Sequence, residues 1–66
     1  MEEILLSDKV KECRRLLEYK QEDIAKLLKT NQTMICLMEK GYIPKKELRA
    51  NVDELYKALT KISKNI

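Results

Sequence analysis

The side chains in this sequence that could carry out covalent or metal chemistry are two cysteines and a few acidic residues. Cys13 and Cys36 lack the spacing of metal ligands, and the chain has no histidine that could complete a site. The neighbouring acids Asp53 and Glu54 fall on an expected helix surface, where carboxylates favour solubility. A single glycine rules out a glycine-rich phosphate loop, and no nucleophile has a base beside it. We therefore expect no catalysis, no bound metal and no cofactor.

Lysine side chains offer a different chemistry, the neutralisation of phosphate groups. Lys40, Lys45 and Lys46 lie close together in the sequence, around the only glycine and the only proline. The formal net charge of +3 permits a nucleic-acid partner but does not require one. A solvated basic loop explains the same lysines equally simply, so both interpretations remain open at this point.

The length and composition of the chain predict one small helical domain. Its 66 residues include no Trp, no Phe and three Tyr, so the core must be aliphatic. One Gly and one Pro leave little material for turns and sheets, which favours an all-α fold over residues 1–66. The apolar cluster Ile4–Leu6 is too short for a membrane span, and no signal peptide is evident. We expect a cytoplasmic protein with reduced thiols and no membrane association.

The most informative stretch covers residues 21–41, where apolar residues recur at helical spacing in two short runs. These apolar positions are Ile24, Ala25, Leu28, Ile35 and Met38. The two runs predict helices over residues 21–28 and 32–40. Asn31 is suited to cap the second helix through its side-chain oxygen, and Gly41 is suited to end it in the left-handed conformation. Two helices joined by so short a turn form a helix-turn-helix.

The joint spacing of Gln21, Ala25, Ile35, Glu39 and Gly41 resembles the lambda-repressor-like helix-turn-helix family, of the Cro and Xre type. The similarity runs without a gap over residues 10–41. Members of this family fold as compact helical bundles whose third helix enters the DNA major groove. The resemblance therefore implies a DNA-binding transcription regulator, such as a bacterial or phage repressor, that binds double-stranded DNA at a palindromic operator as a homodimer.

The resemblance also implies roles for individual side chains. In the family, an arginine at the position of Arg14 pairs with the glutamate at the position of Glu39, and loss of one partner should cost on the order of 3 kcal/mol. The alternative for Arg14 is a solvated charge or a phosphate contact. Gln21 matches a glutamine that contacts a phosphate, and Gln32 matches a position from which a base is read. A glutamine amide can both donate to and accept from adenine.

Other residues of the expected recognition helix complete the candidate site. Thr33, Met34 and Leu37 could contact thymine methyl groups. The remaining phosphate contacts would come from the lysines Lys20, Lys40, Lys45 and Lys46. No arginine projects from this helix, and Leu37 is a poor reader of base edges, so an exposed Met34–Leu37 pair also fits a protein-binding face. The second hypothesis is accordingly a protein-binding module, an antirepressor or adaptor with a regulatory protein partner.

Two positions depart from the family pattern. Lys20 stands where the family places Ser or Thr, and lysine cannot accept the capping hydrogen bond. Glu22 and Asp23 in the first turn of the helix offset its charge. Lys29 stands where the turn carries glycine, because the backbone there is left-handed. A lysine in that conformation costs about 1 kcal/mol.

The remaining residues predict one helix before the motif and one after it. Ser7 is suited to cap a helix over residues 8–18, in which Val10, Cys13 and Leu17 form the buried face and Cys13 acts as a small apolar residue. After Pro44, expected at the first helical position, an apolar stripe runs through the chain. Its positions are Leu48, Val52, Leu55, Leu59, Ile62 and Ile66.

This stripe favours one long helix over residues 45–64, although Asn51 and Glu54 could form a capping box that divides it. The sequence thus predicts a compact bundle of four to five helices with a long C-terminal helix. The second half of the stripe exceeds what a small bundle buries. We expect Leu59, Ile62 and Ile66 to contact a second subunit; the alternative is that they pack on Ile4–Leu6 of the same chain.

Overall fold

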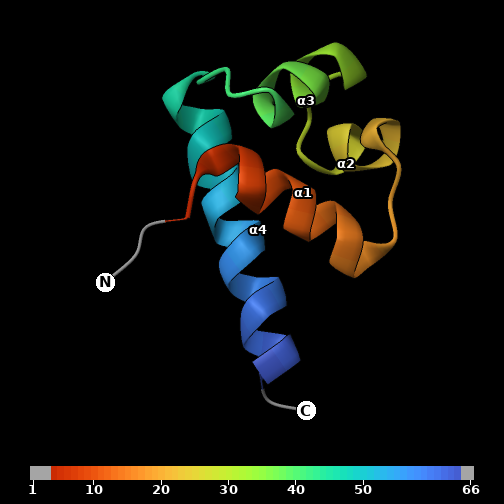
Figure 1. The fold of residues 1–66 in the computed structure, drawn as a ribbon, viewed down its shortest axis with the longest axis vertical. Coiled ribbons are helices and arrows are strands. Elements are labelled where there is room, and N and C mark those ends of the chain that lie inside the picture. Colours follow the sequence, from red (N-terminus) through yellow and green to blue (C-terminus); the bar gives the residue numbers. More distant parts are fainter. Residues whose placement is uncertain (1–3, 65–66) are drawn as a thin grey trace.

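The computed structural model describes the backbone of residues 4–64 and the side chains of residues 4–61. The described chain forms four helices, α1 (Leu6–Leu17), α2 (Gln21–Leu27), α3 (Gln32–Glu39) and α4 (Lys46–Lys64), which are shown in Figure 1. α1 packs against α4 and α3, and α2 packs against α3. The predicted all-α fold with a long C-terminal helix is confirmed, and no helix between residues 4 and 64 is long and apolar enough to cross a bilayer.

The core is aliphatic, as the composition predicts, and every helix contributes to it. Its buried members are Val10, Cys13, Ile24, Ala25, Leu28, Ile35, Met38 and Val52. Burial of these side chains supplies most of the folding free energy, at about 25 cal/mol per Å² of apolar surface removed from water. Ala25 is almost fully buried between the helices of the motif, where its small side chain lets α2 and α3 lie close together.

The beginnings of α1 and α4 differ from the prediction. α1 begins at Leu6 rather than after Ser7, and Leu5 precedes it without a side-chain cap. Leu6 packs against the core from the first turn, which favours this earlier start over a serine cap. Pro44 does not occupy the first position of α4; it is buried, and the helix begins at Lys46.

The first three helices end in the same way, with a residue in the left-handed conformation. Glu18, Lys29 and Gly41 have φ of 57°, 59° and 111°. Two backbone hydrogen bonds accompany each of them; after α2, Thr30 N–H donates to the Ala25 carbonyl at 2.8 Å and Lys29 N–H donates to the Lys26 carbonyl at 3.2 Å. These bonds define Schellman motifs. Lys29 therefore adopts the left-handed backbone conformation that was expected there, although it is not a glycine.

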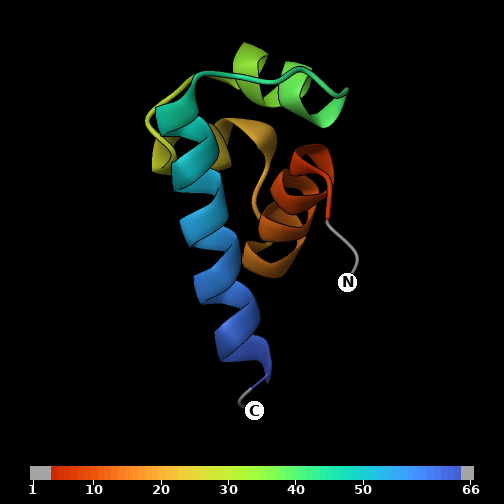
Figure 2. The ribbon, with the colours of Figure 1, turned by 90° about the vertical axis from the view of Figure 1, so that its left-hand side faces the viewer.

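α4 is one continuous helix through Asn51, and its second half extends beyond the other helices, as Figures 1 and 2 show. Leu59 is half-buried and packs against the core of its own chain, and its contact with a second subunit stays a prediction. The side chain of Ile62 and all of Ile66 lie outside the described residues. Ile4 and Leu5 are 46% and 67% exposed, so only Leu6 of the N-terminal apolar cluster reaches the core.

The strained turn after α2 gives a test of this geometry. Lys29→Gly should stabilise the protein by about 0.5–1 kcal/mol, because relief of about 1–2 kcal/mol of left-handed strain exceeds the entropy that glycine adds to the unfolded chain. Urea denaturation followed by circular dichroism measures the change. Lys26→Gly, in the last turn of α2, is the matched control and should destabilise by about 1 kcal/mol. A loss of stability in Lys29→Gly would contradict the left-handed assignment.

Candidate nucleic-acid interface

α3 presents one side to the core and the other to solvent. Ile35 and Met38 are fully buried, whereas Gln32, Thr33 and Leu37 are exposed. The eight-residue helix begins where Asn31 caps it, with the Asn31 Oδ1 accepting from the Met34 backbone N–H at 2.8 Å. The exposed side of α3 thus carries the amide of Gln32, the hydroxyl of Thr33 and the isobutyl group of Leu37, on a short helix that begins at a capping residue.

Met34 occupies an intermediate place on this helix. It is partly buried and packs against the core, so less of its side chain is available to a base than the sequence suggested. Cys36, on the neighbouring side of α3, is a free and partly exposed thiol. Of the four residues predicted to contact bases, Gln32, Thr33 and Leu37 lie on the open side of the helix.

The orientation of α3 is fixed by a hydrogen-bonded network around Glu39. The Arg14 Nε donates to the Glu39 Oε2 at 2.9 Å, and the Arg14 Nη2 donates to the Glu39 Oε1 at 3.1 Å. The predicted ion pair is therefore present, with two-point geometry, between α1 and the end of α3. Glu39 keeps only 9% of its side chain exposed and Arg14 keeps 32%, so the pair is partly desolvated and loss of Arg14 would leave the Glu39 charge nearly buried.

Gln21 belongs to the same network, a connection that the sequence did not suggest. Its Nε2 donates to the Glu39 Oε1 at 3.1 Å, which joins the first turn of α2 to the last turn of α3. The amide nitrogen therefore has a partner within the chain, and the phosphate contact of Gln21 stays a prediction. The signal that could have revealed this bond was the position of Gln21 at the start of a helix packed on α3.

Gln21 and Gln32 lie around one shallow hollow where the starts of α2 and α3 meet. The hollow is lined by Arg14, Tyr19, Lys20, Gln21, Glu22 and Gln32. The structure thus brings together the predicted base reader Gln32 with two of the predicted phosphate contacts, Lys20 and Gln21. At the start of α2, Lys20 provides no side-chain cap; instead its backbone N–H donates to the Asp23 carboxylate at 3.1 Å.

The other predicted phosphate contacts lie where the chain leaves α3. Lys40, Lys45 and Lys46 are all exposed, the first at the end of α3 and the other two at the start of α4. In the sequence, Lys20 precedes α3, and Lys40, Lys45 and Lys46 follow it. Contacts between lysines and phosphates raise the affinity for DNA but do not distinguish one base sequence from another.

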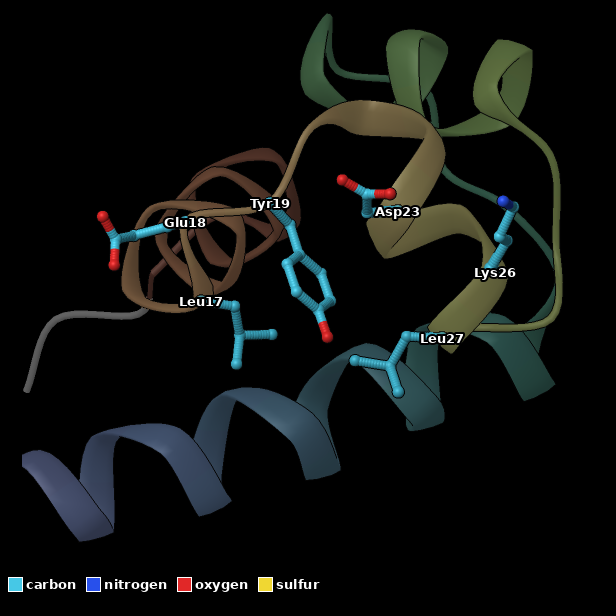
Figure 3. A pocket seen from close by; sticks show the side chains of 6 residues that line it. All are labelled: Leu17, Glu18, Tyr19, Asp23, Lys26 and Leu27. Carbon is cyan, nitrogen blue, oxygen red and sulfur yellow. The ribbon is translucent and has the colours of Figure 1, made fainter.

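A second hollow lies between the end of α1 and α2, on the side that faces α4. It is lined by Leu17, Glu18, Tyr19, Asp23, Lys26 and Leu27, and we call it the α4-facing hollow. Figure 3 shows Leu17, Tyr19 and Leu27 directed toward α4. Tyr19 and Leu27 keep 38% and 48% of their surfaces exposed, so this hollow presents apolar area to solvent.

Comparison of the chain with models of known protein families, with curated proteins and with solved structures gives no match. The interpretation of α3 therefore depends on its own geometry and chemistry and on the resemblance of residues 10–41.

The network around Glu39 makes a quantitative prediction. Arg14→Ala should destabilise the protein by roughly 2–3 kcal/mol, because it leaves a nearly buried carboxylate with only the Gln21 amide as partner. Chemical denaturation measures the loss. Arg15→Ala is the matched control on the same helix: Arg15 donates to Glu12 at 2.6 Å and lowers the pKa of that carboxyl, but solvent screens the pair and the midpoint should not move. Equal effects of the two variants would contradict the assigned role of Arg14.

The two cysteines should differ in reactivity. Burial raises the pKa of the Cys13 thiol to about 11, so only about one thousandth of it is thiolate near pH 8, while Cys36 is partly exposed on α3. Native protein should take up a thiol-specific reagent rapidly at Cys36 and at Cys13 only after unfolding. Mass spectrometry of the labelled peptides provides the measurement, and Cys36→Ser should abolish the rapid phase. Rapid native labelling of Cys13 would contradict its buried position.

Proposed function

We propose that this protein is a sequence-specific DNA-binding transcription regulator that acts as a repressor by occupying a palindromic operator. The observation that supports the proposal most strongly is the exposed side of α3, which carries Gln32, Thr33 and Leu37 on a helix that Glu39 joins to α1 and α2. A single α-helix fits the major groove, so a short outward helix with polar groups near its start is suited to read base edges.

In this proposal each group has a distinct task. The Gln32 amide pairs with adenine by donating to N7 and accepting from the exocyclic amine, while the methyl groups of Thr33 and Leu37 contact thymine methyls. Lys20, Lys40, Lys45 and Lys46 neutralise phosphates and set the position of α3 on the duplex without reading the sequence. The Gln21 Nε2 donates one hydrogen to Glu39, and in this proposal its second N–H donates to a phosphate oxygen.

A homodimer completes the proposal, since two copies of α3 about 34 Å apart meet successive major grooves of a palindromic site. Apolar surface away from α3 supports this assembly. Leu27 is exposed in the α4-facing hollow, and the second half of α4 extends beyond the other helices. An interface built from these elements leaves both recognition helices free.

The second candidate function is a protein-binding module, an antirepressor or adaptor. The exposure of Leu37, at 41%, favours it, because a leucine on the open side of α3 gains more from an apolar partner than from a base edge. One variant distinguishes the two proposals. Under the second proposal, Leu37→Asp should abolish binding to the partner protein and leave the affinity for DNA unchanged.

DNA binding is tested by selecting duplexes from a random pool and measuring affinity as salt rises. The protein should lose affinity linearly in log salt, and Lys45→Ala should weaken all sequences alike while reducing the slope by about 1. Gln32→Ala should lower the preference for the selected site by about 1–3 kcal/mol. Lys61→Ala, an exposed lysine on the distal half of α4, is the matched control and should change neither quantity. Absence of duplex binding in dilute buffer would refute the proposal.

A further inference from the structure

A third hollow lies where the turn after α2, α3, the segment after α3 and the first turns of α4 meet. Side chains from all four line it, among them Leu28, Met34, Tyr42 and Leu48, and we call it the turn hollow. It is more enclosed than the hollow around Gln32 and the α4-facing hollow. Its volume of about 420 Å³ lies within the range of about 300–1,000 Å³ that small-molecule sites occupy.

The apolar side chains of the turn hollow provide a place for an apolar group of a ligand. Leu28 and Pro44 are buried, while Met34 and Leu48 are partly buried and pack against the core. Tyr42 keeps 50% of its surface exposed. An apolar group bound here would remove the remaining exposed area of Met34, Leu48 and Tyr42 from water, which is favourable.

Charges of both signs line the same hollow. They belong to Lys29, Lys45 and Glu47, and all three residues are exposed. Among residues 4–61, no ion pair includes any of them. A complementary small molecule therefore carries a negative group for the two lysines and a positive group for the glutamate, next to an apolar part.

Lys29 contributes to this hollow from a strained backbone. Its φ of 59° lies in the left-handed region, which glycine adopts without strain. A glycine at this position would relax the turn but would leave the hollow with one lysine. Residues held in strained conformations are concentrated at ligand-binding and switch regions, so the strain at Lys29 supports a binding role for its ammonium group.

Simpler ligands match the turn hollow less completely. Inorganic phosphate pairs with the two lysines, but it meets the like charge of Glu47 and leaves the apolar side chains in water. A neutral apolar molecule covers those side chains but leaves all three charges without partners. An α-amino acid with an apolar side chain supplies the carboxylate, the ammonium group and the apolar group together.

We propose that the turn hollow binds an apolar α-amino acid, which acts as an effector that weakens DNA binding. The ligand carboxylate pairs with Lys29 and Lys45, its ammonium group pairs with Glu47, and its side chain contacts Met34 and Leu48. Since Lys45 is also a proposed phosphate contact, the bound carboxylate withdraws one lysine from DNA. This effect rests on the proposed function, whereas the binding of the amino acid does not.

The test is a nuclear magnetic resonance titration of the isotope-labelled full chain with L-phenylalanine and with L-leucine. We expect the largest backbone amide shifts at residues 28–30, 34 and 45–51. The dissociation constants should be on the order of 1 mM, because the ligands are small and the charges are exposed. Two analogues of L-phenylalanine should each bind about threefold more weakly: 3-phenylpropanoate, which lacks the ammonium group, and 2-phenylethylamine, which lacks the carboxylate.

Charge-neutral variants assign the groups. Glu47→Gln should weaken the binding of L-phenylalanine about threefold without weakening that of 3-phenylpropanoate, and Lys29→Gln should weaken both about threefold. The matched controls are Glu54→Gln and Lys26→Gln, which alter exposed residues outside the turn hollow and should change neither affinity. In wild-type protein, saturating L-phenylalanine should weaken duplex binding and reduce the salt slope by about 1, as Lys45→Ala does.

Three results would overturn the site: no shifts up to about 20 mM ligand, largest shifts outside these residues, or equal affinities for L-phenylalanine and its two analogues. An unchanged duplex affinity in saturating ligand would overturn the effector role. Binding of the amino acid by a chain that binds no duplex would uphold the site and refute the proposed function.

Discussion

The position of α3 depends on one carboxylate, that of Glu39. It accepts two hydrogen bonds from Arg14 of α1 and one from Gln21 of α2, so three helices meet at a single group. A chain of 66 residues buries a small aliphatic core, and hydrophobic burial has no preferred direction. Directional bonds to a nearly buried charge supply the missing constraint, and no buried polar side-chain atom among the described residues lacks a partner.

The parts of the fold that could be predicted from sequence were those set by local chemistry. Helical periodicity located the motif, Asn31 caps α3 as expected, and the apolar stripe extends through Asn51 as one helix. The family resemblance anticipated the bond between Arg14 and Glu39. The predicted start of α1 was wrong, because the packing of Leu6 against the core outweighs the capping bond that Ser7 could make. That packing depends on tertiary contacts.

The candidate site was harder to anticipate, because exposure and pairing are properties of the fold. Gln21 was expected to face phosphate, yet its amide nitrogen is bonded to Glu39. Met34 was expected to contact a base, yet it is partly buried and packs against the core. Conversely, nothing in the sequence distinguished Tyr42, whose backbone N–H donates to the Leu37 carbonyl and whose side chain is half exposed.

The measurement that tests the account most directly is a nuclear magnetic resonance titration of the isotope-labelled chain with duplex DNA at low salt. If α3 enters the major groove, the largest shifts should occur in the backbone amides of residues 32–37 and in the side-chain amide of Gln32, with residues 53–61 of α4 unchanged. Largest shifts in the second half of α4, or none at all, would contradict the central claim that α3 is the surface that reads DNA.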